Sequence, residues 1–92
     1  MTIRNRNNHN YELGNKIREL RERLSDINGG MQGFIDYASD NLFGGEEWIS
    51  LKTLSNYELG KNVPNLSNAK KLSVALQMDL SDFIAEIEDY ID

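Results

Sequence analysis

The segment 55–65, with the sequence SNYELGKNVPN, places a carboxylate where an amphipathic run of residues ends. Glu58 stands between two side chains that can enter a core, and the run is then closed by Gly60 and by the chain's only proline, Pro64. A carboxylate near a small core is costly unless it is paired and hydrogen-bonded. Glu58 is therefore expected either to have a cationic partner or to remain in solvent.

The other reactive residue types give little basis for catalysis or for a metal site. The single histidine, His9, lies in a polar N-terminal stretch, and no serine or carboxylate pair stands in a context that suggests an activated nucleophile or an acid-base pair. One histidine, no cysteine and scattered acids make no set of metal ligands. We expect no catalytic residue, no metal and no cofactor.

The charges are segregated along the chain. The net charge of −5 argues at first against a nucleic-acid partner. However, residues 1–25 carry six basic and three acidic side chains, and residues 51–71 carry four basic and one acidic side chain. All the charged side chains of residues 26–50 and 72–92 are acidic. A bound polyanion responds to the local potential within a Debye length of ~8–10 Å, so one face can be positive on a negative molecule. The alternative is that the blocks are solvated faces.

The length and the hydropathy of the chain bound its architecture. A chain of 92 residues predicts one domain with a core that is marginal on its own, so self-association would be a natural source of further burial. No apolar run approaches the ~20 residues that cross a bilayer, and the N-terminus has no signal-like stretch. We expect a cytoplasmic protein with no membrane segment, a flexible basic arm at residues 1–9 and a single domain at residues 10–92.

Apolar residues recur at steps of three and four in five segments, which predicts an all-α domain. The expected helices cover about residues 10–25, 31–43, 50–59, 65–76 and 80–91. The predicted N-caps are Asn10, Ser50, Asn65 and Asp79. Gly60 suits the left-handed position just past the third helix, and Gln77 is expected to end the fourth in a right-handed turn.

Two segments carry a known pattern. Residues 17–21 read Ile-x-x-Leu-Arg, and residues 53–64 read Thr-aliphatic-Ser-x-x-Glu-x-Gly-Lys-x-x-Pro, preceded by Ile49-Ser50. This order and spacing resemble the XRE family of phage-repressor-type helix-turn-helix regulators, over about residues 13–25 and 48–84. The resemblance implies a five-helix, lambda-repressor-like domain with an extended C-terminal helix, and double-stranded DNA as the partner.

The resemblance also implies roles for single residues. Arg21 would pair with Glu58, because a guanidinium can bind both carboxylate oxygens. The bases would be read by Leu51, Lys52, Thr53 and Asn56. The phosphates would be bound by Gln32, Ser50, Lys61 and Asn62, and the arm residues Arg4 and Arg6 would reach a minor groove. Leu51 departs from the family, which often has a polar residue there, so it either touches a thymine methyl group or belongs to the core.

About a dozen residues between Leu20 and Glu58 are extra relative to the family pattern, which leaves the register of the second helix open. Gln32 with Ile35 matches the family's Gln-x-x-Leu. Tyr37-Ala38 matches its Leu-Ala equally well, and that register removes Gln32 from the phosphate role.

The turn before the third helix is longer and more acidic than the family's tight turn. Phosphates would repel Glu46 and Glu47, so this turn is expected to point away from a duplex. Trp48 is expected to anchor the turn in the core.

We interpret the protein as a sequence-specific transcriptional regulator, most simply a repressor. It would bind its operator as a homodimer through the amphipathic C-terminal helix, because paired recognition helices suit palindromic sites. That helix could instead pack back on the first. The alternative function is a protein-interaction module of the antitoxin or anti-repressor type, with a protein partner at the acidic insertion.

Overall fold

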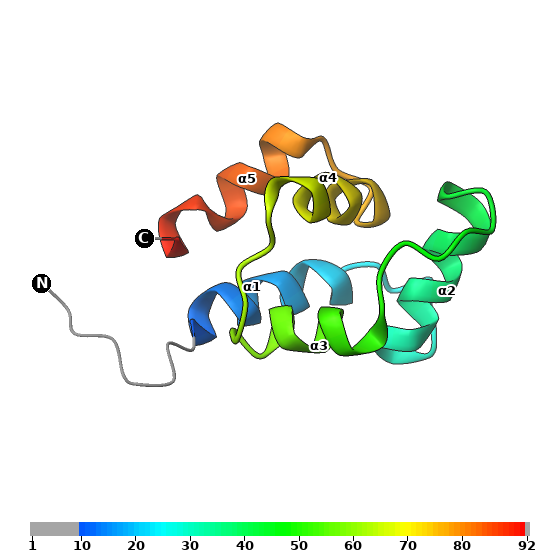
Figure 1. Cartoon of the computed structure of the whole chain (residues 1–92), viewed down its shortest axis with the longest axis horizontal. Coiled ribbons are helices and arrows are strands. Elements are labelled where there is room, and N and C mark those ends of the chain that lie inside the picture. The colour runs from blue at the N-terminus through cyan, green and yellow to red at the C-terminus, as the bar shows by residue number, and fades with distance from the viewer. Residues whose placement is uncertain (1–9, 92) are drawn as a thin grey trace, which may run out of the picture.

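The computed structural model describes residues 10–91, which form five α-helices and one 3-10 turn (Figure 1). The elements are α1 (Tyr11–Glu22), α2 (Gly30–Leu42), α3 (Leu51–Glu58), α4 (Leu66–Ala75), α5 (Leu80–Ile87) and the turn η1 (Glu88–Tyr90). This part of the chain contains no strand, so the predicted all-α class is confirmed. The arm predicted at residues 1–9, with its proposed DNA contacts Arg4 and Arg6, lies outside the described residues.

Three of the four predicted N-cap residues cap the start of their helices with a side-chain hydrogen bond. In each case the side-chain oxygen accepts a hydrogen bond from the backbone N–H three residues later, over 3.1 Å at Asn10, 3.0 Å at Ser50 and 2.8 Å at Asn65. Each bond satisfies a donor that the first helical turn leaves without a partner. Asp79 has the extended backbone of an N-cap, but its side chain makes no capping bond.

The helices form two layers that are joined at one end. α1 packs along α3, α4 packs on α5, α1 also contacts α5, and α2 packs against both α3 and α4 (Figure 1). All five helices face one hydrophobic core, whose largest fully buried side chains are Phe34, Phe83, Leu13, Ile17, Leu54, Leu72 and Ile87. None of the described helices is both long and apolar enough to span a membrane.

The C-terminal helix is shorter than the predicted segment 80–91. α5 ends at Ile87, and the chain continues as η1. The side chain of Asn10 donates a hydrogen bond to the backbone carbonyl of Tyr90, which holds the C-terminal segment against the start of α1. Phe83 and Ile87 are buried, and the partly buried Leu80, Ile84 and Tyr90 pack on the same core. Much of the apolar stripe is thus packed inside the chain, where α5 contacts both α1 and α4.

Gln77 ends α4 in the left-handed region, with a φ of 61°. The prediction of a right-handed turn is therefore wrong. The backbone N–H of Gln77 donates to the carbonyl of Val74, and that of Met78 donates to the carbonyl of Ser73, each over 2.9 Å. This pair of bonds is the Schellman motif, which needs a left-handed residue at position 77 whatever its side chain.

Replacing Gln77 with glycine is expected to raise the free energy of unfolding by about 1 kcal/mol. Glycine avoids the Cβ strain of positive φ, about 1–2 kcal/mol, and gives back part of that gain through the greater freedom of the unfolded chain. Urea unfolding of the full chain measures the change. Val74→Gly, at an exposed position inside the same helix, is the matched control and should lower stability by about 0.5 kcal/mol. A Gln77→Gly protein less stable than wild type would contradict the argument.

Candidate nucleic-acid interface

The first turn of α3 presents a mixed polar and apolar edge to solvent. Ser50, Leu51 and Lys52 are exposed, and Thr53 and Asn56 are half-buried. Leu51 is 45% exposed, so it does not belong to the core. The hydroxyl of Ser50 is engaged inside the turn, since it accepts from the N–H of Thr53 and donates to Thr53 Oγ1 over 2.8 Å.

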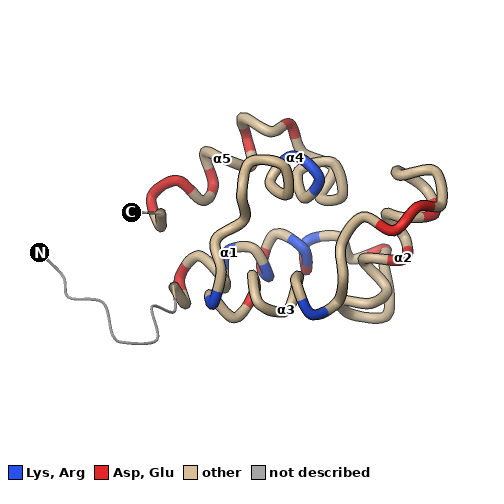
Figure 2. The backbone as a smooth tube through the Cα atoms, viewed as in Figure 1, with Lys and Arg blue, Asp and Glu red and all other residues tan. Residues whose placement is uncertain are grey.

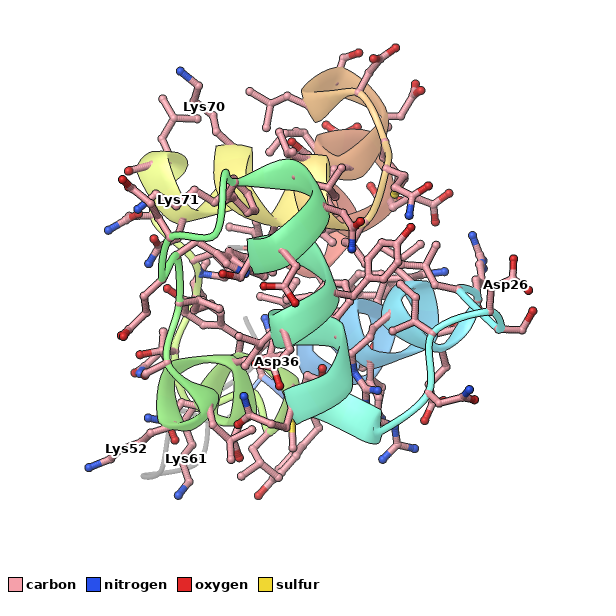
Figure 3. All side chains as sticks on the ribbon, turned by 90° about the vertical axis from the view of Figure 1, so that its right-hand side faces the viewer. Asp26, Asp36, Lys52, Lys61, Lys70 and Lys71 are labelled. Atoms are coloured by element: carbon pink, nitrogen blue, oxygen red, sulfur yellow. The ribbon has the colours of Figure 1, made fainter. Side chains whose placement is uncertain are left out.

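The turn after α3 is a second Schellman motif. Gly60 has a φ of 76°, and its N–H donates to the carbonyl of Tyr57 over 3.1 Å. The N–H of Lys61 donates to the carbonyl of Asn56 over 2.9 Å. Lys61 and Asn62 follow as exposed residues. Lys52 and Lys61, from the two ends of the helix, both project into solvent at the lower edge of Figure 3.

On its opposite side, the end of α3 lies very close to α1. A side chain would have no space at either of two glycines of this contact, Gly14 and Gly60. A Cβ on Gly14 of α1 would lie 2.4 Å from the carbonyl oxygen of Glu58 and 2.7 Å from the nitrogen of Gly60. A Cβ on Gly60 would lie 2.2 Å from the carbonyl oxygen of Asn10, whose own N–H donates to the carbonyl of Gly60 over 2.7 Å. The backbones of α1 and of the turn after α3 are therefore in direct contact.

Arg21 and Glu58 form the bidentate ion pair that the resemblance implies. Arg21 Nε donates to Glu58 Oε2 over 2.6 Å, and Arg21 Nη2 donates to Oε1 over 3.0 Å. The two side chains are only 13% and 5% exposed. The hydrogen bond to Glu58 raises the pKa of the Arg21 guanidinium, burial opposes the rise, and the charges of Glu58 and Glu22 add to it. With the glycine contacts, this pair fixes how α3 leans on α1.

The exposed cations differ in how they are engaged. The basic side chains of Lys16 and Arg18 on α1, and of Arg23 just after it, are in ion pairs, with Glu86, Glu22 and Glu19 respectively. Lys52, Lys61, Lys70 and Lys71 are exposed and make no ion pair with any described residue. The positive block of residues 51–71 is therefore the accessible one. The sequence patterns do not single out Lys70 and Lys71; their only signal is membership of that block.

The comparison with known families bears on the same segment. Residues 45–83 match the family model described as helix-turn-helix. Over this range the chain is similar to helix-turn-helix domains, which supports the resemblance to the XRE family. No match to the chain was found among curated proteins or among solved structures. The matched range covers α3, α4 and the start of α5, and it supports DNA-binding regulation of the XRE type as the class of function.

The turn before α3 is longer than in the XRE pattern and is anchored by Trp48. Its Nε1 donates to the carbonyl of Ile35 over 3.0 Å, and its ring stacks on Phe43 with centroids 5.0 Å apart. Ser39 Oγ donates to the carbonyl of Glu46 over 2.7 Å, which ties the acidic part of the turn to α2. Figure 2 shows an acidic stretch following α2 at the end of the molecule, apart from the basic positions of α3 and α4. Trp48 is thus the core anchor that was expected.

Burial favours one register of α2 relative to the XRE pattern. Ile35 is buried whereas Tyr37 is 40% exposed, so Ile35 takes the core position that the pattern gives to leucine. Gln32 then occupies the pattern's glutamine position near the N-terminus of α2. However, its Nε2 donates to the carboxylate of Asp36 over 2.9 Å. A phosphate contact through Gln32 would have to replace that bond beside a negative charge, so Gln32 is a weaker candidate than Lys61.

Proposed function

We propose that the protein is a sequence-specific transcriptional regulator that inserts the N-terminal half of α3 into the major groove of DNA. The observation that carries the proposal is the division of α3 into two faces. Leu51 and Lys52 project into solvent, while Gly14 and the Arg21–Glu58 pair hold the opposite face on α1. A helix supported from behind can enter the ~12 Å groove without losing its place in the fold.

The proposed contacts divide into base reading and phosphate binding. Lys52 would donate to guanine O6 and N7, and Leu51 would contact the methyl group of thymine. Thr53 and Asn56 would complete the base-reading set. Lys61 and Asn62 would bind phosphates on the flank of the groove, with Ser50 and Gln32 as further positions.

Repression as a homodimer is the finer part of the proposal. Two copies of α3 about 34 Å apart would match a two-fold operator, and occupancy of that operator would block transcription. Because Phe83 and Ile87 of the α5 stripe are buried within the chain, a dimer through this segment would rely on the exposed Ile91 and on the partly buried Leu80 and Ile84. Sedimentation of the full chain with and without its duplex measures the oligomeric state. A DNA partner is compatible with the cytoplasmic location predicted from the sequence.

Selection of duplexes from a random pool by the full chain tests the function directly. A regulator should enrich a short defined sequence, and log affinity for it should fall with log salt by about 0.9 per phosphate contact. The alternative, a protein-interaction module, is favoured by Glu46 and Glu47, which are exposed in the turn before α3. Absence of any enriched sequence would reject the regulator and favour that module.

Two single substitutions should separate base reading from phosphate binding. Lys52→Ala should reduce discrimination at one base pair by about tenfold, which corresponds to a good base contact of about 1–3 kcal/mol. Lys61→Ala should instead weaken all sequences alike and make the salt slope shallower by about 0.9. Competition titrations with the selected duplex and its point variants measure both effects. Uniform weakening by Lys52→Ala, with no change in preference, would remove that residue from the base-reading set.

A further inference from the structure

The segment from α3 to the end of α4 presents only positive charge to solvent. Residues 51–78 contain a single acid, Glu58, which is buried and bound to Arg21. Their other charged residues are four exposed lysines, two on or just after α3 and two on α4. The acids resume at Asp79, at the start of α5. The positive surface is therefore larger than the base-reading helix and its turn.

Lys70 and Lys71 lie on the outer surface of α4. Their neighbours Ala69, Leu72 and Ser73 are buried, so the two lysines occupy the part of the helix that faces away from the core. Figure 3, which views the molecule along its long axis, shows Lys70 and Lys71 on the same side as Lys52 and Lys61, with Asp26 on the opposite side. The four ammonium groups can therefore face one partner.

The dimensions of the domain allow a single duplex to meet both pairs of lysines. The two shorter axes, which span the view of Figure 3, measure 25 and 23 Å. One turn of DNA is about 34 Å long and carries a phosphate every ~3.4 Å on each strand. A duplex that receives α3 in its major groove is therefore long enough to offer phosphates to both pairs of lysines.

We propose that Lys70 and Lys71 form a second phosphate-binding site, which grips the DNA backbone outside the groove that α3 enters. The inference rests on the proposed function, because it takes the same duplex as its ligand. The site binds phosphodiester groups and carries no base specificity, since an ammonium group on the outside of a duplex meets only the backbone. Its role is to add affinity and to fix the angle at which α3 enters the groove.

The test is a salt titration of the full chain with the selected duplex. The double variant Lys70→Ala/Lys71→Ala should make the slope of log affinity against log salt shallower by about 1.8, or 0.9 for each lost contact, with the ranking of duplex sequences unchanged. The matched control is Arg18→Ala/Arg23→Ala, which removes the same charge from exposed but ion-paired residues on α1 and just after it. Its slope should equal that of wild type.

The outcomes separate this inference from the proposed function. An unchanged slope for the α4 variant, or an equal change in the α1 control, would overturn the second site while leaving α3 as the DNA reader. Failure of the wild-type chain to select any duplex would overturn the proposed function, and the second site with it. A changed ranking of sequences in the α4 variant would contradict a backbone-only role.

Discussion

Replacing Arg21 with alanine is expected to lower the free energy of unfolding by about 3 kcal/mol. The substitution leaves the carboxylate of Glu58 buried without its two hydrogen bonds, and breaking a buried pair from one side typically costs about 3–5 kcal/mol. For a domain of this size, a loss of about 3 kcal/mol corresponds to a drop in melting temperature on the order of 15 °C. Thermal and urea unfolding of the full chain measure both quantities.

Arg18 provides the matched control on the same helix. Its guanidinium is exposed and its nearest acid, Glu22, lies 3.9 Å away one turn later. Arg18→Ala should therefore change stability by no more than about 0.5 kcal/mol. Equal melting temperatures for the two alanine variants would show that the pair does not stabilise the fold.

A double substitution separates the ion pair from simple loss of packing. Replacing both partners by apolar residues, as in Arg21→Met with Glu58→Leu, removes the stranded charge and should restore most of the stability lost by Arg21→Ala. A double variant less stable than Arg21→Ala would mean that the polar network, rather than the buried charge, is what the fold requires.

The starts of α1, α3 and α4 could be predicted because a side-chain N-cap is a local event, whereas α2 begins after Gly29 without such a cap. Ser50 and Asn65 each bind the backbone N–H three residues later, so the residues that decide the cap are adjacent in the sequence. The periodicity of apolar residues then identified the buried face of every helix. Neither inference needs any knowledge of how the helices are arranged.

The helix ends were harder to predict, for a different reason at each of two helices. The apolar period of the last helix runs to Ile91, yet α5 ends at Ile87, and the carbonyl of Tyr90 is bound by Asn10 from the other end of the domain. At the end of α4, the hydrogen bonds of the Schellman motif impose a left-handed residue, and Gln77 adopts it despite its Cβ. The first partner is distant in the sequence, and the second turn is closed by the backbone carbonyls of Ser73 and Val74, which no residue type marks.

The candidate interface was predictable where a motif carries it and not where tertiary packing does. Lys52 and Lys61 fall inside the recognised pattern, whereas Lys70 and Lys71 gain meaning only because α4 turns them toward the same side. Conversely, the positive block of residues 1–25 counts Arg18 and Arg23, whose charges are matched by acids on α1 itself. Counting charges along the sequence does not distinguish a cation that is in an ion pair from one that is free to bind a partner.

Replacing Gly60 with alanine is expected to lower the free energy of unfolding by at least about 3 kcal/mol. The new Cβ would lie 2.2 Å from the carbonyl oxygen and 2.4 Å from the carbonyl carbon of Asn10, which are backbone atoms that cannot turn aside as a side chain can. To relieve the clash, the turn after α3 must move away from α1 and break the bond between Asn10 N–H and the Gly60 carbonyl. Losses of this size are exceptional for one methyl group and mark an enforced backbone contact.

The variant Gly44→Ala is the control that separates this clash from the ordinary strain of a side chain at positive φ. It has a φ of 66°, close to the 76° of Gly60, but a Cβ there would meet no atom within 4 Å. Gly44→Ala should therefore lose only the left-handed strain, about 1–2 kcal/mol. Chemical unfolding of both variants gives the comparison, and the difference between them measures the α1–α3 contact alone. Equal losses at the two positions would mean that α3 is not locked on α1 through this turn. The rigid support of the proposed DNA-reading face would then have to come from the Arg21–Glu58 pair by itself.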